Sequence, residues 1–305
     1  MDTDLDTFVV ALYVKIDDWL RTHRELARWR PKVGIAPKLS DAEVATLAVL
    51  QALLGFTSEA RFLRYADQHL RAWFPYLPHQ SGYNKRLRAA QGQLRGLIRL
   101  LAVDTDLWFD DTWVVDSTPV ECGRSRPTVK RSDLAGFAAY GYCASHSRFF
   151  WGLRLHLVCT PAGLPITFAL AGAKTDEREV LRELMEAEPH LLRSRPGQVI
   201  LADKGYASGE LETFLVDQGA HLVRPARKDE RRRPGAALLK PLRQLIESVN
   251  DTLKGQLDLE RHGGHTPAGV VTRVLQRLLA LTAVIWHNSR TGNTPLRSLI
   301  AYDHG

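Results

Sequence analysis

Apolar residues recur at helical spacing through the first hundred residues of the chain. In residues 8–19 they fall on one side of a predicted helix that would bury that side. Ser40-Asp41-Ala42-Glu43 has the form of a capping box, and it predicts the start of a second, strongly apolar helix that Gly55 ends. Two further amphipathic helices are predicted at residues 58–74 and, with Ser81 as its cap, at 82–101.

From about residue 106 onward, short β-rich runs alternate with helical segments. Strands are predicted at 112–116, where Ser117-Thr118-Pro119 stops the run, and at 149–159, 165–170, 198–202 and 221–224. The turn at Pro161-Ala162-Gly163 joins the strands at 149–159 and 165–170 into a predicted hairpin. Helices are predicted at 175–187 with Asp176 as cap, at 209–218, at 238–255 and at 266–286. This alternation is typical of an α/β domain. We therefore expect a helical domain at 1–106 and an α/β domain at 107–305.

Composition adds a charge bias to this picture. The 305 residues include 41 Lys+Arg and 34 Asp+Glu, which gives a net charge of +7. Such a balance suggests a polyanionic partner, although many basic proteins bind no nucleic acid. Three cysteines without a Cys-x-x-Cys pair indicate reduced thiols. The N-terminus is acidic, and the apolar stretch at 44–56 is interrupted by Gln51 and too short to span a bilayer. We therefore expect a soluble, intracellular protein.

Two groups of basic residues are candidates for phosphate contact. On the predicted helix 82–101 a basic stripe lies beside the apolar one, formed by Arg88, Arg95 and Arg99 and joined by Lys85 and Arg86. A helix against DNA and a solvated charged face explain this stripe equally well. Residues 224–234 carry Arg224, Arg227, Lys228, Arg231, Arg232 and Arg233. We expect this run to lie outside the core, as a solvated loop or as a phosphate-binding loop.

Three carboxylates stand out by their positions. Asp116 and Asp203 each end a predicted strand, and Gly205 allows a tight turn beside the second. Glu247 lies in the middle of the polar side of helix 238–255. Strand-end carboxylates are common Mg²⁺ ligands, but each residue also has a structural explanation. Asp203 could cap a turn, and Glu247 could pair with Arg243 four residues earlier.

Together these residues resemble the motifs of DDE-type transposases of bacterial insertion sequences. Val114-Val115-Asp116-Ser117 resembles the first motif, and Asp203-Lys204-Gly205-Tyr206 resembles the Asp-x-Gly-Tyr motif. Arg243, Glu247 and Lys254 resemble the Arg-x3-Glu-x6-Lys signature. The resemblance covers about residues 110–290. It departs from the family where the signature tyrosine falls on Lys240, and the 43 residues between Asp203 and Glu247 leave no room for a large inserted β-domain.

The resemblance implies an RNase H-like (retroviral-integrase-like) catalytic core, with a mixed sheet flanked by helices and preceded by an all-α DNA-binding region. It implies that Asp116, Asp203 and Glu247 hold two Mg²⁺ ions, with Mn²⁺ able to substitute. It also implies cleavage at terminal inverted repeats, joining of the 3′-OH ends to target DNA, and a homodimer on paired ends. We expect the protein in the bacterial cytosol at the nucleoid, without membrane contact.

The expected DNA contacts are Arg243, Lys254, Lys240, Tyr206, Lys204, Lys85, Arg86, Arg88, Arg95, Arg227, Lys228, Arg231 and Arg232. For Tyr206, stacking on a base and packing beneath the site are equally open. Asp251 and Glu260 are the alternatives to Glu247, and His156 and His262 could approach the site. Two other functions fit the same motifs: an RNase H-like nuclease without strand transfer, and a catalytically inactive, transposase-derived DNA-binding protein.

Overall fold

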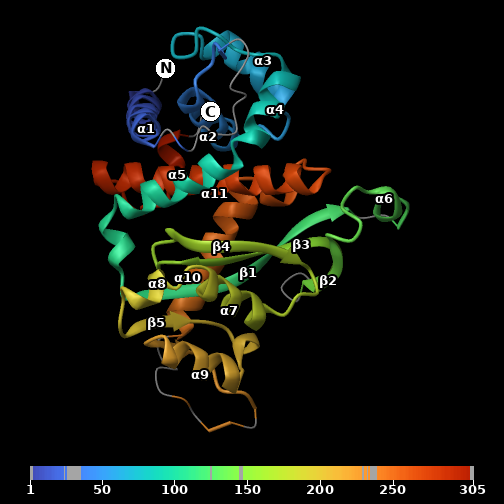
Figure 1. Cartoon of the computed structure of the whole chain (residues 1–305), viewed down its shortest axis with the longest axis vertical. Coiled ribbons are helices and arrows are strands. Elements are labelled where there is room, and N and C mark those ends of the chain that lie inside the picture. Colours follow the sequence, from blue (N-terminus) through green and yellow to red (C-terminus); the bar gives the residue numbers. More distant parts are fainter. Residues whose placement is uncertain are drawn as a thin grey trace. The chain divides into compact units, whose positions relative to one another are not determined.

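The computed structural model describes residues 3–23, 25, 36–123, 126–143, 147–228, 230, 231, 233 and 239–302 (Figure 1). The chain divides into two compact units. The helical unit comprises Met1–Leu101 and Leu253–Gly305, and the sheet unit comprises Ala102–Thr252. The first boundary lies close to the predicted one at residue 106. Residues from Leu253 onward, which the sequence placed with the α/β domain, group instead with the N-terminal helices.

The described part of the helical unit consists of helices and their connections. They are α1 (Thr3–Thr22), α2 (Asp41–Leu53), α3 (Glu59–His69), α4 (Gln80–Ala89), most of α5 (Gln91–Val103), the π-helix η6 (Thr252–Gln256), η7 (Leu259–Arg261), α11 (Pro267–Thr291) and η8 (Ile300–Tyr302). The predicted capping box is confirmed, because the Ser40 hydroxyl accepts a bond from the Glu43 amide and the Glu43 carboxylate accepts one from the Ser40 amide. Gly55, with φ at +69°, follows α2 as predicted.

The single helix predicted at 82–101 is wrong, because α4 and α5 are separated at Ala90. The Gln91 side chain, at the start of α5, donates to the Ala268 carbonyl and the Thr272 hydroxyl of α11, both at 2.7 Å. These long-range bonds favour the break at Ala90 over a continuous helix. Ser81 is not a cap, because α4 begins at Gln80. Helix α3 likewise ends before the predicted residue 74.

Helix α11 forms much of the core of the helical unit. Among the described helices it alone is long and apolar enough to cross a membrane, but 83% of its most apolar window is buried inside the protein. A helix that is apolar on all sides is typical of such a central position. Its buried Arg273 donates to Glu59 of α3 at 2.5 Å, and Gln276 donates to the Ala48 carbonyl of α2 at 2.8 Å.

The sheet unit contains a mixed sheet with helices. Its strands are β1 (Thr112–Gly123), β2 (Ala139–Cys143), β3 (Arg148–Cys159), β4 (Pro165–Gly172), β5 (Gln198–Leu201) and β6 (Ala220–Val223). Its helices are η2 (Asp106–Phe109), α6 (Arg126–Arg131), α7 (Glu177–Ala187), α8 (His190–Arg193), η4 (Lys204–Tyr206), α9 (Gly209–Asp217) and α10 (Leu239–Asp251). Strand β3 pairs antiparallel with β1, β2 and β4, whereas β1, β5 and β6 are parallel. The predicted hairpin is β3–β4.

Strand β1 does not stop at the predicted Pro119 but continues to Gly123. Strand β5 pairs with β1 from Thr112 to Val114. The later residues of β1, Pro119 among them, therefore have no β5 partner on that side. A proline is tolerated at such an edge, where its missing N–H costs no ladder bond. Asp116 therefore lies within a strand rather than at its end. Strand β2 was not predicted, because its five residues include a glycine and its pairing partner β3 decides its conformation.

The pleat of the sheet assigns neighbouring residues of β1 to opposite faces. Asp116 is paired with Leu157 and Ser117 with His156. Ser117 bonds to Glu177 of α7, and Asp116 bonds to Asn250 of α10. Since successive side chains of a strand point to opposite faces, α7 and α10 cover opposite faces of the sheet around these two residues.

Candidate active site

Asp116 and Asp203 lie at the same level on neighbouring parallel strands. The last paired residues of β1 and β5 are Val114 and Leu201, and each aspartate comes two residues later. Beyond this pair the two strands are no longer joined, so the aspartates border the opening between them. Asp116 is half-buried and Asp203 is exposed. The sequence placed both acids at strand ends, and the register of the sheet now brings them together.

The Asp116 carboxyl has a pKa that is raised from its ordinary value of 3.8 to about 6. Burial is the main cause, and the negative charges of Glu177 and Asp203 add to it. A backbone bond from Ser117 and the bond from the Asn250 amide, at 2.7 Å, oppose the rise. A buried carboxyl whose pKa is raised by neighbouring negative charges favours a bound cation, which offsets the repulsion between them.

Asp203 also performs the structural role that the sequence left open. Its Oδ1 accepts a bond of 2.7 Å from the Gly205 amide, and it caps the short helix η4. A Cβ atom at residue 205 would lie 2.8 Å from that Oδ1 and 3.4 Å from Glu177 Oε2. A side chain at residue 205 would therefore displace the Asp203 carboxylate, whereas its contact with Glu177 would be ordinary. Capping uses one oxygen of Asp203, so this role does not conflict with metal binding.

Glu177 is a further acid of the site that the sequence did not reveal. Its Oε1 accepts bonds from the Ser117 hydroxyl at 2.5 Å and from Arg154 Nη1 at 3.0 Å. Arg154 also donates to the Ser117 hydroxyl at 2.6 Å and to the Tyr142 carbonyl at 2.8 Å. These residues are far apart in the chain, so no local motif connects them. The sequence showed Glu177 only as an acid directly after the helix cap Asp176, and this position indicated the start of a helix rather than a site residue.

Tyr206 packs beneath this group of acids. Its side chain is fully buried, and within the described residues its hydroxyl has no hydrogen-bond partner. Burial raises its pKa well above 10, and the charges of Glu177, Asp116 and Asp203 raise it further. Of the two roles left open for Tyr206, the structure favours packing under the site, and stacking on a base is wrong for this conformation.

Glu247 lies on α10, three residues before the Asn250 that binds Asp116. Residues three apart are neighbours on a helix surface, so Glu247 lies on the part of α10 adjoining that contact. Its side chain is exposed, as is that of Asp251, the last residue of the helix. Within the described residues no three His, Cys, Asp or Glu side chains are grouped closely enough to hold a metal ion. Glu247 as the third ligand therefore stays a prediction.

The two histidines have other environments. His156 is buried, and burial, together with the nearby Arg154 charge, lowers its pKa to about 4. It is therefore neutral at physiological pH. His262 belongs to the helical unit, where its Nδ1 accepts a bond from the Gly264 amide.

Comparison with known families shows to which family the chain belongs. Residues 107–283, more than half of its length, match the family described as the transposase DDE domain. The chain belongs to the DDE transposase family. This match contains Asp116, Asp203 and Glu247, and DDE transposases generally use divalent metal ions. The carboxylate oxygens of Asp116 and Asp203 fit that requirement in the kind of ligand atom offered.

One solved structure with similarity to this DDE transposase is the cryo-EM structure of the piggyBac transposase synaptic complex with hairpin DNA. The TM-score is 0.33 at 13% identity, covering 77% of this chain and 53% of the piggyBac chain. The DDE transposase thus spans about half the length of that protein. No curated protein matches it.

The basic residues predicted to contact DNA have different environments in this DDE transposase. Exposed positions are Lys85, Arg88, Arg95, Lys204, Arg227, Lys228 and Arg231. Arg86 is not on an exposed basic edge, because it forms an ion pair of 2.6 Å with the buried Asp41. Lys254 lies in the π-helix after α10, so the α-helical phase expected from Glu247 does not extend to it. Arg232 and the side chains of Lys240 and Arg243 lie outside the described residues.

The basic run 224–234 is not wholly outside the core. Arg224 is only 3% exposed, and its guanidinium forms ion pairs with Glu212 at 2.8 Å and with Glu230 at 2.7 Å. Two carboxylates satisfy a buried guanidinium, which explains why an arginine is tolerated there. The prediction that this residue stays out of the core is wrong.

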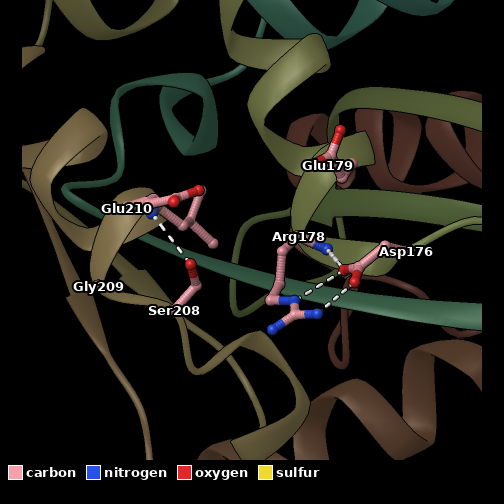
Figure 2. Close-up of a pocket in the computed structure, with 7 residues that line it drawn as sticks. Asp176, Arg178, Glu179, Ser208, Gly209 and Glu210 are labelled. Atoms are coloured by element: carbon pink, nitrogen blue, oxygen red, sulfur yellow. Dashed lines mark hydrogen bonds and ion pairs between the residues drawn. The ribbon is translucent and has the colours of Figure 1, made fainter.

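A hollow of about 440 Å³ lies between the starts of α7 and α9 of the DDE transposase (Figure 2). Asp176 and Ser208, the caps of these two helices, line it together with Arg178, Glu179 and Glu210. Figure 2 shows Arg178 turned toward Asp176, which accepts a bond of 2.8 Å from its Nε. Three acids and an arginine that is already paired do not favour a phosphate in this hollow.

Proposed function

We propose that the chain is the transposase of a DNA insertion sequence in the bacterial cytosol. It binds the terminal inverted repeats, cuts the element's ends by phosphodiester hydrolysis and joins the freed 3′-OH to target DNA. The observation that carries this proposal is the equal register of Asp116 and Asp203, two residues beyond the last β1–β5 pair. Family membership supports the reaction class. The antiparallel β4, β3 and β1 followed by the parallel β5 and β6 support an RNase H-like core.

Some residues of the site are proposed to bind metal ions, and others orient those ligands. Asp116 and Asp203, with Glu247 as the proposed third ligand, would hold two Mg²⁺ ions. The chemistry that these ligands would gain from bound Mg²⁺ is activation of the attacking water or hydroxyl and stabilisation of the leaving oxygen. Asn250 fixes the orientation of Asp116 through its 2.7 Å bond. Arg154 and Ser117 hold Glu177 beside the two aspartates. Lys204 is the proposed contact for a DNA phosphate, which its exposure and its position next in sequence to Asp203 support.

The proposal assigns repeat recognition to the helical unit and assumes a homodimer that holds two ends. Exposed Arg88 and Arg95 are its candidate contacts. An Arg88→Ala/Arg95→Ala variant should bind end DNA several-fold more weakly in a mobility-shift assay. Undiminished binding would exclude these two residues from repeat recognition.

The decisive test is cleavage of labelled duplex DNA that carries the element's own ends, with Mg²⁺ or with EDTA. Asp203→Asn is the sharpest variant, because an asparagine oxygen can still accept the Gly205 amide while the charge is lost. The expected result is metal-dependent cleavage at the end by the wild type and a loss of at least a hundredfold in the variant. Asp217→Asn, an exposed aspartate at the end of α9, is the matched control. Normal cleavage by Asp203→Asn would overturn the assignment.

The third ligand is tested by comparing Glu247→Gln with Asp251→Asn in the same assay. We expect the first to abolish cleavage and the second to retain most of it. The opposite result would move the role to Asp251.

The same DNA substrates and variants distinguish the proposed function from two related ones. A nuclease without strand transfer would cut ends but fail to join precut 3′-OH ends to a target plasmid. A catalytically inactive DNA-binding derivative would bind the ends and leave them uncut, in wild type and variants alike.

A further inference from the structure

Exposed aromatic side chains are concentrated around the β2–β3 hairpin of the sheet unit. Phe137, Tyr140, Tyr142 and Phe149 are all more than a third exposed, and Phe149 reaches 78%. Among the described residues, the other exposed large apolar side chains are scattered over both units. Large aromatic rings grouped on a surface usually mark a site of interaction.

Strand pairing places three of these rings on one face. Tyr142 is paired with Phe149, and their ring centroids are 5.0 Å apart. Tyr140 is two residues from Tyr142 along β2, so it points to the same side. We call these three residues the aromatic platform. Within the part of the chain that the structure describes, strand β2 pairs with β3 alone and forms the edge of the sheet, so no described strand shields the platform on its outer side.

The platform lies on the same face of the sheet as Asp116. Its residue Phe149 and the residue Leu157, which is paired with Asp116, are an even number of positions apart along β3. Trp151, the partner of Tyr140, lies six positions from Leu157, which corresponds to about 20 Å along the strand. A DNA strand that passes Asp116 and follows this face would therefore reach the platform within several nucleotides.

The charge around the hairpin favours a polyanionic occupant over an apolar protein surface. Residues 121–154 contain six Lys or Arg and two Asp or Glu. Lys130 and Arg131 are exposed, while Arg148 is partly exposed and pairs with Glu121 at 3.3 Å. Arg154 lies on the opposite face of β3 from the platform, where it bonds to both the Tyr142 carbonyl and Glu177.

We propose that the aromatic platform binds unpaired DNA bases by stacking. The inference builds on the proposed transposase function and adds the form of DNA that the site takes. Rings exposed at the edge of a sheet offer flat surfaces to bases, and stacking requires bases that are not already paired and stacked in a duplex. The exposed Lys130 and Arg131 at the end of α6 are the cations that hold the phosphates of the same strand.

The test uses the full chain and a fluorescent single-stranded oligothymidylate, with a duplex of equal length and a fixed salt concentration. Binding is measured by fluorescence anisotropy for the wild type, Tyr142→Ala/Phe149→Ala and Phe149→Trp. The double variant should bind the single strand at least tenfold more weakly and the duplex within about twofold of wild type. Phe149→Trp should retain binding. Phe109→Ala, a change at a 72% exposed ring in η2, is the control and should have no effect.

A second readout reports stacking itself. 2-Aminopurine in the single strand should be quenched on binding wild type and Phe149→Trp, and not on binding the double variant. Equal losses for single strand and duplex, or unchanged affinity for both, would overturn the proposal. Dissociation of a wild-type dimer in the double variant, with unchanged single-strand affinity, would assign the platform to a second copy of the chain and also overturn it.

End cleavage by the wild type, assayed in parallel, keeps the two proposals distinguishable. Cleavage without platform-dependent single-strand binding defeats only the inference about the platform. Platform-dependent stacking without cleavage supports the inference and defeats the proposed transposase reaction.

Discussion

The Asp116 carboxylate destabilises the metal-free protein at neutral pH. Burial and the charges of Glu177 and Asp203 raise its pKa from 3.8 to about 6. Because the folded state then binds the proton more tightly than the unfolded chain, stability falls as the pH rises from about 4 through 6. The difference between the two pKa values corresponds to about 3 kcal/mol at pH 7 and above.

Asp116→Asn removes this charge with little change in shape. The asparagine oxygen can still accept the bond from Asn250. We expect the free energy of unfolding of the variant to exceed that of wild type by about 2–3 kcal/mol at pH 8, and to equal it near pH 4. The corresponding rise in melting temperature at pH 8 is roughly 5–10 °C. The variant should at the same time lose cleavage, since it loses a proposed metal ligand.

The assay is urea unfolding in EDTA at intervals from pH 4 to pH 8. His156 acts in the opposite direction, because its lowered pKa of about 4 makes the folded state less stable as the pH falls below its ordinary value of 6.5. Both proteins contain His156, so the difference between them isolates Asp116. Asp133→Asn, a change at an exposed carboxylate, is the control. A variant less stable than wild type at pH 8, or a difference that does not change with pH, would refute the reasoning.

Three further predictions concern stability measured by urea unfolding. Gly152→Ala would place a Cβ 2.2 Å from a β1 carbonyl oxygen and should lower the free energy of unfolding by about 2–3 kcal/mol. The control Gly209→Ala, whose Cβ would have nothing within 4 Å, should stay within about 1 kcal/mol of wild type. Equal effects of the two changes would contradict the packing argument. Arg273→Met leaves the buried Glu59 without its cation and should lower the free energy of unfolding by about 3 kcal/mol. Adding Glu59→Gln should restore most of this loss, and no recovery would show that the ion pair is not the cause. Ser40→Ala removes the capping side chain of α2 and should cost about 1 kcal/mol, and an unchanged unfolding midpoint would show that the cap contributes nothing.

Local signals in the sequence predicted elements whose causes are themselves local. The caps at Ser40 and Asp176 and the β3–β4 hairpin depend on residues close together in the chain, and the structure confirms them. The continuation of β1 through Pro119 and the break at Ala90 depend on partners far away in sequence. A single sequence does not reveal those partners.

The candidate site also contains both residues that local sequence signals predict and a residue that depends on distant partners. Asp116 and Asp203 were predicted because each follows an apolar run and belongs to a recognisable motif. Glu177 was not, because Arg154 and Ser117 join it to the site across three separate elements. Its presence beside both aspartates is a product of the tertiary fold alone.

The division of the chain has a consequence for synthesis on the ribosome. The sheet unit is an insertion within the helical unit, because the segments before Ala102 and after Thr252 form one compact body. Buried positions of α2 and α3 receive their partners from Arg273 and Gln276 of α11, near the end of the chain. A nascent chain can thus close its sheet while its first helices still lack part of their core. Any function of the helical unit therefore becomes available only after α11 has been translated, and termination before α11 leaves α2 and α3 without these partners.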